Sequence, residues 1–410
     1  MRLATMAERY ERPSWVRRIN AMGDSVGGAR RLLPLDAEAL LAGAAASLGG
    51  GEFGDFGDPR WRERFGSLVA ALDAADLTSV GRLLTRQELL RSLRSRHLLA
   101  RAWDEKPAIA GERILAPVIV TGPARSGTSI LFELLWLDPA FRAPLACEAL
   151  HPLPLPGAAS DRRLAISECE QELWADVQPE FAAIHELRSD LPVECVTLTA
   201  PCFCGPHWPM VVQMPAWAPD VPEMYRFHRR ILQVLQHGSE ARTWLLKTPG
   251  HLMTLDLLFA TYPDAWVVQT HRDPAKTMPS TVSTTAMVRW LRAEHVDVGA
   301  LAAGIEAAFS AALCGVAEAR SKRALPDRFV DVHFQRLMRD PVAALRAAYA
   351  RMGRSFGDEH AERVRAYLAS KPKGKFGTHR YTPAEWGFDA GALRARLAPY
   401  VDHFGVELED

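Results

Sequence analysis

Five consecutive residues carry the clearest chemical signal in the sequence: Arg125, Ser126, Gly127, Thr128 and Ser129. They follow an apolar, β-branched run at 118–121 that predicts a buried strand, and they precede an apolar run at 130–137 that predicts a helix. The first N–H groups of a helix have no internal partner, and the helix dipole makes that end positive. Arg125 adds a permanent cation with forked donors. We therefore expect the loop 122–129 to bind an oxyanion.

This loop differs from the nucleotide-triphosphate loop G-x-x-x-x-G-K-[ST] at one position. Gly122, Gly127 and the final hydroxyl are kept, but Thr128 stands where that motif has its lysine. The lysine normally reaches the β- and γ-phosphates, so its absence argues against ATP or GTP hydrolysis. A tight strand–helix turn that binds nothing is the simpler alternative.

A second strand-to-helix junction follows the apolar run at 265–270. Arg272 comes directly after this predicted strand, Asp273 can cap the next helix, and Ser280 lies eight residues beyond the arginine. A guanidinium can bind a phosphate through two parallel hydrogen bonds, and a serine hydroxyl can donate another. The alternative is that Arg272 and Asp273 belong to an ion network at the strand end.

In this order, the two junctions resemble the signatures of the sulfotransferases that use 3′-phosphoadenosine 5′-phosphosulfate (PAPS), in particular their tyrosylprotein, glycan and bacterial branches. The similarity covers roughly residues 115–400, and its first two motifs are the specific ones. It implies that Arg272 and Ser280 bind the 3′-phosphate of PAPS. It also implies that the 5′-phosphosulfate is bound by Gly122, Arg125, Ser126, Gly127, Thr128 and Ser129.

The basic loop 371–381 is a weaker similarity. The family often closes its cofactor site with such a loop, which implies that Lys373, Lys375 or Arg380 reaches the 3′-phosphate or the acceptor. A solvated basic turn is the alternative.

Sulfonate transfer requires an acceptor oxygen relieved of its proton and cations near the sulfonate, and it requires no metal. The resemblance implies that Arg125 stabilises the leaving phosphate. Lys247, at the end of a predicted strand, can stabilise the bridging oxygen or the sulfonate; alternatively, it is a strand-end lysine that reaches solvent.

Two residues compete as the base. Glu148 matches the glutamate of the glycan and tyrosylprotein branches. His251 resembles a histidine of the cytosolic enzymes but is displaced by two inserted residues, so we favour Glu148.

The acceptor is not specified by any motif. The apolar, proline-rich stretch 191–219 and the helical N-terminus favour a small-molecule or lipid-like hydroxyl acceptor over a highly charged glycan. Two other functions stay open: a P-loop nucleotide-triphosphate kinase or hydrolase, and a non-catalytic member of the same fold.

Composition is that of a soluble globular protein, with 410 residues, a formal net charge of zero and 24% charged residues. It does not suggest a nucleic-acid-binding face. The charged N-terminus lacks a secretory signal, and no run approaches 18 consecutive apolar residues, so we expect a cytoplasmic protein without a transmembrane segment. Cys202, Cys204 and His207 suggest zinc, but no second ligand pair accompanies them, and we expect no metal.

Alternating strands and helices predict an α/β fold, a P-loop-like parallel sheet flanked by helices, with its ligand at the carboxyl ends of the strands. The predicted strands are 118–121, 244–248, 265–270 and 328–333. Helical patterns fill 36–104, and Thr85 with Glu88 predicts a capping box just before the third of these helices. We expect a helical N-terminal extension over residues 1–112 and the PAPS-binding domain over residues 113–410.

Overall fold

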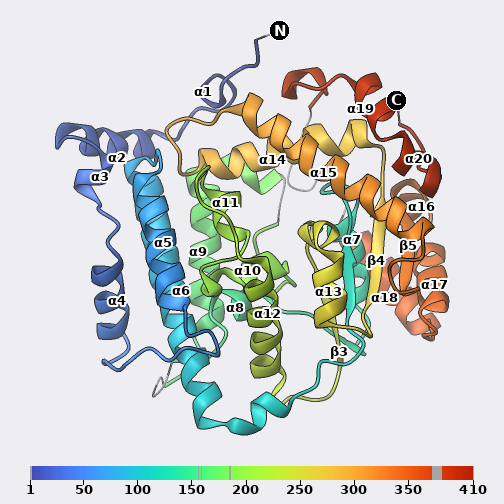
Figure 1. Ribbon diagram of the computed structural model, residues 1–410, viewed down its shortest axis with the longest axis horizontal. Helices are drawn as coiled ribbons and strands as arrows, with labels where there is room; N and C mark the ends of the chain where they lie inside the picture. The colour runs from blue at the N-terminus through green and yellow to red at the C-terminus, as the bar shows by residue number, and fades with distance from the viewer. Residues whose placement is uncertain (1, 156, 158, 184–185, 372–380, 410) are drawn as a thin grey trace.

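The computed structural model describes residues 2–155, 157, 159–183, 186–371 and 381–409. Within them lies one parallel sheet of five strands in the order β2-β3-β1-β4-β5 (Figure 1). The strands are β1 (Val118–Thr121), β2 (Phe141–Arg142), β3 (Thr243–Lys247), β4 (Trp266–His271) and β5 (Phe329–His333). The predicted α/β fold is confirmed, and so are the four predicted strands within one or two residues. The edge strand β2 was not predicted because two residues show no periodicity.

Both faces of the sheet are covered, which explains why β1 is a continuous apolar run. Val118 and Val120 pack in one apolar cluster with residues of α7 (Thr128–Trp136), α17 (Pro341–Arg351) and α18 (Asp358–Ser370). Ile119, between them in sequence, packs on the other face with residues of α12 (Val221–Gln236) and α13 (Leu255–Thr261). Alternate residues of a strand point to opposite faces, so a doubly covered strand has no polar side.

Helix α14 (Pro274–Trp290) begins directly after β4, with Asp273 as its N-cap, and α15 (Val298–Ser321) packs against it (Figure 1). Among the described helices, α15 has the length and apolar composition to cross a membrane. Charged residues divide its apolar residues into shorter runs, so the sequence shows no 18 consecutive apolar residues at this helix. A core helix passes the same test, and α15 also contacts α20 (Ala398–Phe404).

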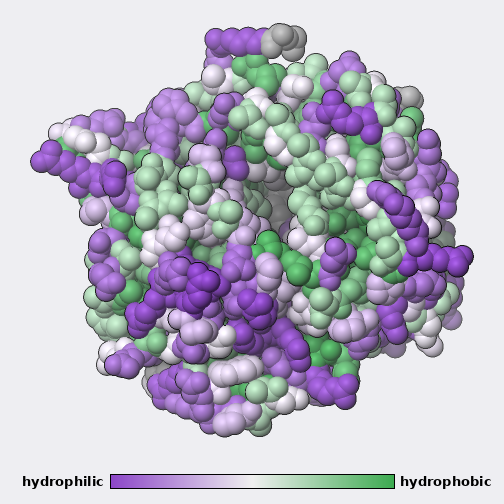
Figure 2. All heavy atoms as spheres, in the orientation of Figure 1, coloured by the Kyte–Doolittle hydropathy of each residue, from purple (hydrophilic) through white to green (hydrophobic). Residues whose placement is uncertain are grey.

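The N-terminal helices stand beside this α/β unit (Figure 1). They are α1 (Met6–Arg9), α2 (Ser14–Ser25), α3 (Ala29–Leu32), α4 (Ala37–Ala46), α5 (Trp61–Ala74) and α6 (Ser79–Glu105). The corner formed by α2 and α3 projects at the left of Figure 2 and carries mainly hydrophilic residues. Elsewhere these helices share a core with the sheet, since Phe65 of α5 and Leu93 of α6 belong to the same apolar cluster as Ile119. The boundary at residue 112 stays a prediction.

The predicted start of the third N-terminal helix is wrong. Helix α6 begins at Ser79, and its N-cap is Thr78, whose side chain accepts a hydrogen bond from the Gly81 N–H. Thr85 lies inside the helix, and its hydroxyl donates to the Gly81 carbonyl. Glu88 is buried in mid-helix, in an ion pair with Arg292. Glu88 therefore takes part in a tertiary ion pair and not in a capping box at a helix end.

The remaining helices are short or connect the sheet to its cover. They are η1 (Pro107–Gly111), α8 (Ala146–Leu150), α9 (Arg163–Val177), η2 (Pro179–Ala183), α10 (Cys195–Leu198), η3 (Ala200–Cys202), α11 (His207–Val211), η4 (Pro249–Met253), α16 (Phe334–Arg339), η5 (Ala384–Trp386) and α19 (Ala390–Arg396). The proline-rich stretch 191–219 contains three single helical turns, α10, η3 and α11, connected by loops. The six cysteines are free thiols, and no cluster of metal-binding side chains occurs among the described residues.

Candidate active site

The glycine loop between β1 and α7 has the backbone of an anion-binding site. Gly127 adopts φ 88° and precedes α7 without a side chain to cap the helix, so the first N–H groups of α7 stay available to a ligand. Gly122 adopts φ 136°, and a Cβ atom there would lie 2.2 Å from Oγ1 of Thr270 in β4. Both glycines are therefore required by conformation, and Gly122 is required by close approach as well.

The loop hydroxyls point in different directions. Ser126 is fully buried, and its Oγ lies 2.5 Å from both the Pro123 carbonyl and Thr270 Oγ1. Its side chain therefore fixes the loop against β4, and its backbone N–H donates to the Pro123 carbonyl at 3.2 Å. The contact of Ser126 with the phosphosulfate stays a prediction. Ser129 Oγ, by contrast, accepts a hydrogen bond from Lys247 Nζ at 3.1 Å. Ser129 therefore points toward the end of β3.

Lys247 links the loop to a carboxylate. It ends β3, which pairs with β1 so that Lys247 lies beside Val120, and its side chain is 3% exposed. Its Nζ lies 2.5 Å from Oε1 of Glu194 in addition to its bond with Ser129. The lysine thus lies between the predicted phosphosulfate loop and a carboxylate from a distant segment.

Glu194 was missed by sequence reasoning. It immediately precedes α10 in the proline-rich stretch, where no motif or periodicity distinguishes it from a solvated carboxylate. Its other oxygen, Oε2, is 3.5 Å from Thr248 Oγ1, and that hydroxyl accepts the Val196 N–H. Only the tertiary contact with Lys247 identifies it.

Glu194 opens onto an apolar cavity of about 210 Å³, which we call the inner cavity. Much of its lining is apolar, including Trp174, Phe181, Val193, Met210 and Val288. A hydroxyl compound held here would place its oxygen near the Glu194–Lys247 pair, with its apolar part in the cavity.

One polar wall of the inner cavity contains Glu88 and His207, and the buried Arg292 pairs with that glutamate. Arg292 Nη2 donates to Glu88 Oε1 at 2.7 Å, and His207 Nε2 lies 3.4 Å from Glu88 Oε2. Burial alone would raise the pKa of Glu88, but Arg292 and His207 outweigh burial and lower that pKa to about 2. The carboxylate is therefore ionised and paired, and this wall is structural.

The two residues predicted to compete as the base, Glu148 and His251, are not part of the lining of the inner cavity. Glu148 accepts the Leu145 N–H at 3.1 Å and an Arg142 N–H at 3.2 Å, and it lines a different cavity. His251 is buried in η4, where its Nδ1 lies 2.7 Å from the Tyr225 hydroxyl, and burial lowers its pKa to about 4.

The second predicted junction approaches the glycine loop. Arg272 Nη1 donates to the Arg125 carbonyl at 2.8 Å, and the guanidinium lies over the Phe334 ring. Its Nε and Nη2 both donate to the Glu409 carboxylate, at 2.7 and 2.9 Å. The carboxylate thus occupies the bidentate position on Arg272 that a phosphate would use.

Ser280 fits the predicted phosphate contact. It is completely buried in α14, and its Oγ has no hydrogen-bond partner among the described residues. A buried hydroxyl without a partner costs free energy that a bound oxyanion would recover. The loop N–H groups and the two arginines suit an anionic ligand, and the contact of Ser280 with the 3′-phosphate stays a prediction. Lys373, Lys375 and Arg380 lie outside the described residues.

Comparison with known proteins gives a consistent result. A sequence model described as the sulfotransferase family matches residues 117–358. A curated relative, the omega-hydroxy-beta-dihydromenaquinone-9 sulfotransferase Stf3 of Mycobacterium tuberculosis, is 23% identical over 278 residues, 65% of this chain and 70% of its own. The crystal structure of sulfotransferase STF9 from Mycobacterium avium is 26% identical with a TM-score of 0.78, covering 92% of this chain and 98% of that one. STF1 from M. tuberculosis H37Rv is 28% identical with a TM-score of 0.70, covering 88% and 98%.

Proposed function

Because the chain belongs to the sulfotransferase family and is a sulfotransferase, we propose that it transfers the sulfonate group of PAPS to the hydroxyl group of an apolar acceptor. The observation that carries this proposal is the position of Lys247. Its ammonium group bonds to Ser129 of the glycine loop on one side and to Glu194 at the inner cavity on the other. A donor held by the loop and an acceptor held in the cavity would meet at this cation.

The donor is held by the two anion-binding junctions. The N–H groups at the start of α7 and Arg125 bind the phosphosulfate, while Arg272 and Ser280 bind the 3′-phosphate. PAPS supplies the sulfonate, whose bond to the phosphate oxygen breaks as the acceptor oxygen bonds to sulfur. Lys247 stabilises the negative charge that develops between the two oxygens.

Glu194 is the base in this proposal. It accepts the proton of the acceptor hydroxyl, because it is the carboxylate that both lines the inner cavity and contacts Lys247. The sequence favoured Glu148 for this role. The bonds of Glu148 to Leu145 and Arg142, and its place at another cavity, favour Glu194 instead.

The acceptor is a small-molecule or lipid-like alcohol. The apolar lining of the inner cavity supports this class, and the Stf3 relative is by name a sulfotransferase of a hydroxylated menaquinone, which is also lipid-like. A cytoplasmic location stays a prediction.

Binding of the donor product tests the proposal. We expect 3′-phosphoadenosine 5′-phosphate at about a hundredfold excess over Kd to stabilise the chain by roughly 2.7 kcal/mol in a thermal-shift titration. Adenosine 5′-phosphate should shift the midpoint much less, because it lacks the 3′-phosphate that Arg272 binds. In Arg272→Ala the difference between the two nucleotides should disappear, with each shift measured against that variant's own unliganded midpoint. A shift with ATP and Mg²⁺ but none with the 3′-phosphorylated nucleotide would favour the kinase alternative.

A further inference from the structure

A second, larger cavity adjoins the inner cavity. This outer cavity has a volume of about 510 Å³ and lies between α6, the loop after α8 and the start of α9. Its lining combines apolar side chains, among them Leu83, Leu90, Leu155 and Ile166, with five arginines. The aliphatic stems of arginines can pack against apolar groups while their charged ends reach solvent. The sulfotransferase chemistry proposed above makes no use of it, so its occupant is an open question.

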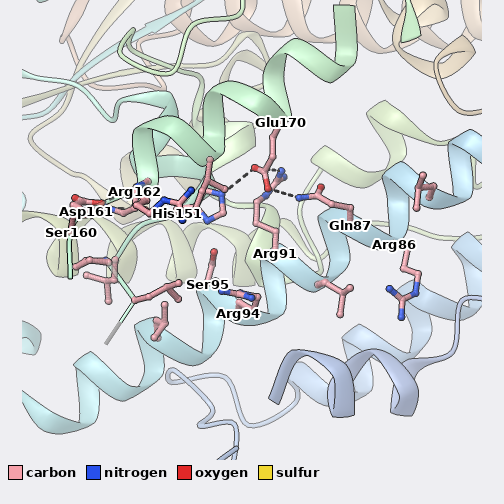
Figure 3. Close-up of a pocket in the computed structure, with 18 residues that line it drawn as sticks. Arg86, Gln87, Arg91, Arg94, Ser95, His151, Ser160, Asp161, Arg162 and Glu170 are labelled. Carbon is pink, nitrogen blue, oxygen red and sulfur yellow. Dashed lines mark hydrogen bonds and ion pairs between the residues drawn. The ribbon is translucent and has the colours of Figure 1, made fainter. Parts of the chain in front are cut away.

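A charged cluster lies where the two cavities meet. Glu170 of α9 accepts hydrogen bonds from Gln87 and Arg91 of α6 and contacts His151, which follows α8 (Figure 3). The Arg91 Nη1 and His151 Nε2 atoms each lie 3.1 Å from Glu170 Oε2. Arg91 and Glu170 line both cavities. The Glu170 cluster, meaning these four side chains, therefore lies at the boundary between the cavities, which we call the neck.

The negative charge of Glu170 is balanced within the cluster. Burial alone would raise the pKa of Glu170, but the hydrogen bond from His151 and the charge of Arg91 lower it, so the carboxylate stays ionised. With three partners around one carboxylate, an apolar group can lie against the neck without leaving a buried charge unpaired.

The sizes of the cavities indicate how they are used. Sites for small molecules commonly measure roughly 300–1,000 Å³. The inner cavity, at about 210 Å³, is smaller than this range, whereas the outer cavity, at about 510 Å³, lies within it. An acceptor of ordinary ligand size that reaches Glu194 would therefore extend beyond the inner cavity, and the neck is where the outer cavity begins.

We propose that the acceptor is an elongated apolar alcohol that occupies both cavities. Its hydroxyl lies at Glu194, its near part fills the inner cavity, and its distal chain passes the Glu170 cluster into the outer cavity. This inference rests on the proposed function, since Glu194 and Lys247 define the reacting end. The exposed leucines of the outer cavity support it: Leu83 is 47% exposed and Leu155 is 39% exposed, and a bound chain would cover both.

A series of primary alcohols tests this inference. We would measure kcat/KM with PAPS for hexan-1-ol, dodecan-1-ol and hexadecan-1-ol, and binding of the same alcohols to the enzyme loaded with 3′-phosphoadenosine 5′-phosphate by titration calorimetry. Each methylene that enters the cavities should raise kcat/KM by up to about threefold to fourfold. The rise should therefore continue from the hexanol to the longer alcohols.

Filling the outer cavity should remove only the increase in kcat/KM that longer alcohols show over shorter ones. Leu83→Trp and Leu155→Trp place a larger side chain in its lining, and both positions are exposed enough for the fold to tolerate the change. We expect these variants to lose tenfold or more of the kcat/KM for hexadecan-1-ol, whereas the kcat/KM for hexan-1-ol should change less than twofold. Leu115→Trp is the matched control, because Leu115 is 54% exposed and lines neither cavity.

The outcomes separate this inference from the function on which it rests. Equal losses for short and long alcohols, or a wild-type enzyme without dependence on length, would overturn the two-cavity acceptor while leaving sulfonate transfer intact. Failure to bind 3′-phosphoadenosine 5′-phosphate would overturn the proposed function itself. If no alcohol is turned over, calorimetric binding that fails to strengthen with chain length overturns the inference directly.

Discussion

At the scale of single residues, the proposed reacting centre depends on one contact between Lys247 and Glu194, which are 53 positions apart in sequence. The lysine is nearly inaccessible and the carboxylate is partly exposed toward the inner cavity. A buried ammonium group needs a charged partner, and the partner's exposed side remains available to an acceptor hydroxyl. The pair therefore serves both the fold and the proposed chemistry.

We expect Glu194→Gln to lower kcat by about 10²–10⁴-fold, because the amide cannot accept the acceptor proton. The thermal shift with 3′-phosphoadenosine 5′-phosphate should be preserved, which separates lost chemistry from lost folding. Glu63→Gln, at an exposed position in α5, controls for removal of a carboxylate. If Glu148→Gln abolishes turnover and Glu194→Gln does not, the base is Glu148, as the sequence had favoured.

At the scale of elements, the segment after α20 returns to the second junction. Its Glu409 binds Arg272 through two hydrogen bonds, and the Glu409 N–H donates to Asp273, the N-cap of α14. Arg394 of α19 donates to the same Asp273 carboxylate. The C-terminal segment is thus anchored on Arg272, which the 3′-phosphate is expected to use, and on the neighbouring Asp273.

Glu409 and a 3′-phosphate would compete for the same two guanidinium donors. We expect Glu409→Gln to strengthen binding of 3′-phosphoadenosine 5′-phosphate by about twofold to fivefold, the range of a partly exposed ion pair. Titration calorimetry measures this directly. Glu407→Gln makes the same charge change two residues away, where the partner is Arg336, and should have little effect. Weaker binding in Glu409→Gln would mean that Glu409 orients Arg272 for the phosphate.

At the scale of the whole molecule, the N-terminal helices are part of the framework of the site. Helix α6 carries Glu88, Arg91 and Gln87, which line the two cavities, and its N-cap Thr78 bonds through its N–H to the Arg292 carbonyl after α14. Gly81 makes this approach possible, since a Cβ atom there would lie 2.0 Å from the Arg292 carbonyl oxygen.

We therefore expect Gly81→Ala to lower the free energy of unfolding by about 1–3 kcal/mol, because the backbones of α6 and the Arg292 segment must separate. Gly66→Ala is the matched control. A Cβ atom at Gly66 would meet no atom within 4 Å, so this helical position should gain about 0.5–1 kcal/mol from alanine's helix propensity. Thermal unfolding measures both, and equal midpoints would show that α6 is not fixed by this contact.

Local features of the chain were sufficient to predict the donor side of the site. An anion-binding loop uses the N–H groups of consecutive residues between a strand and a helix, so its pattern of Gly122, Arg125 and Gly127 is contiguous in sequence. The same holds for Arg272 and Ser280, which lie on one strand end and the helix that follows. Buried parallel strands can also be predicted from the sequence, because each is an apolar run bounded by turns. These features gave the fold, the family and the expected phosphate-binding residues.

The residues proposed for the acceptor side were identified from the tertiary structure. Glu194 carries no local signal, and its pairing with Lys247 depends on how α10 packs against the end of β3. Glu148 matched a family pattern, yet its bonds within α8 turn it toward another cavity. Glu88 resembled a capping residue, yet it pairs with Arg292, 204 positions away. The Glu194–Lys247 and Glu88–Arg292 contacts join segments that are far apart in sequence, where no local pattern indicates the pairing. The path of the folded chain therefore determined which carboxylate meets the cation.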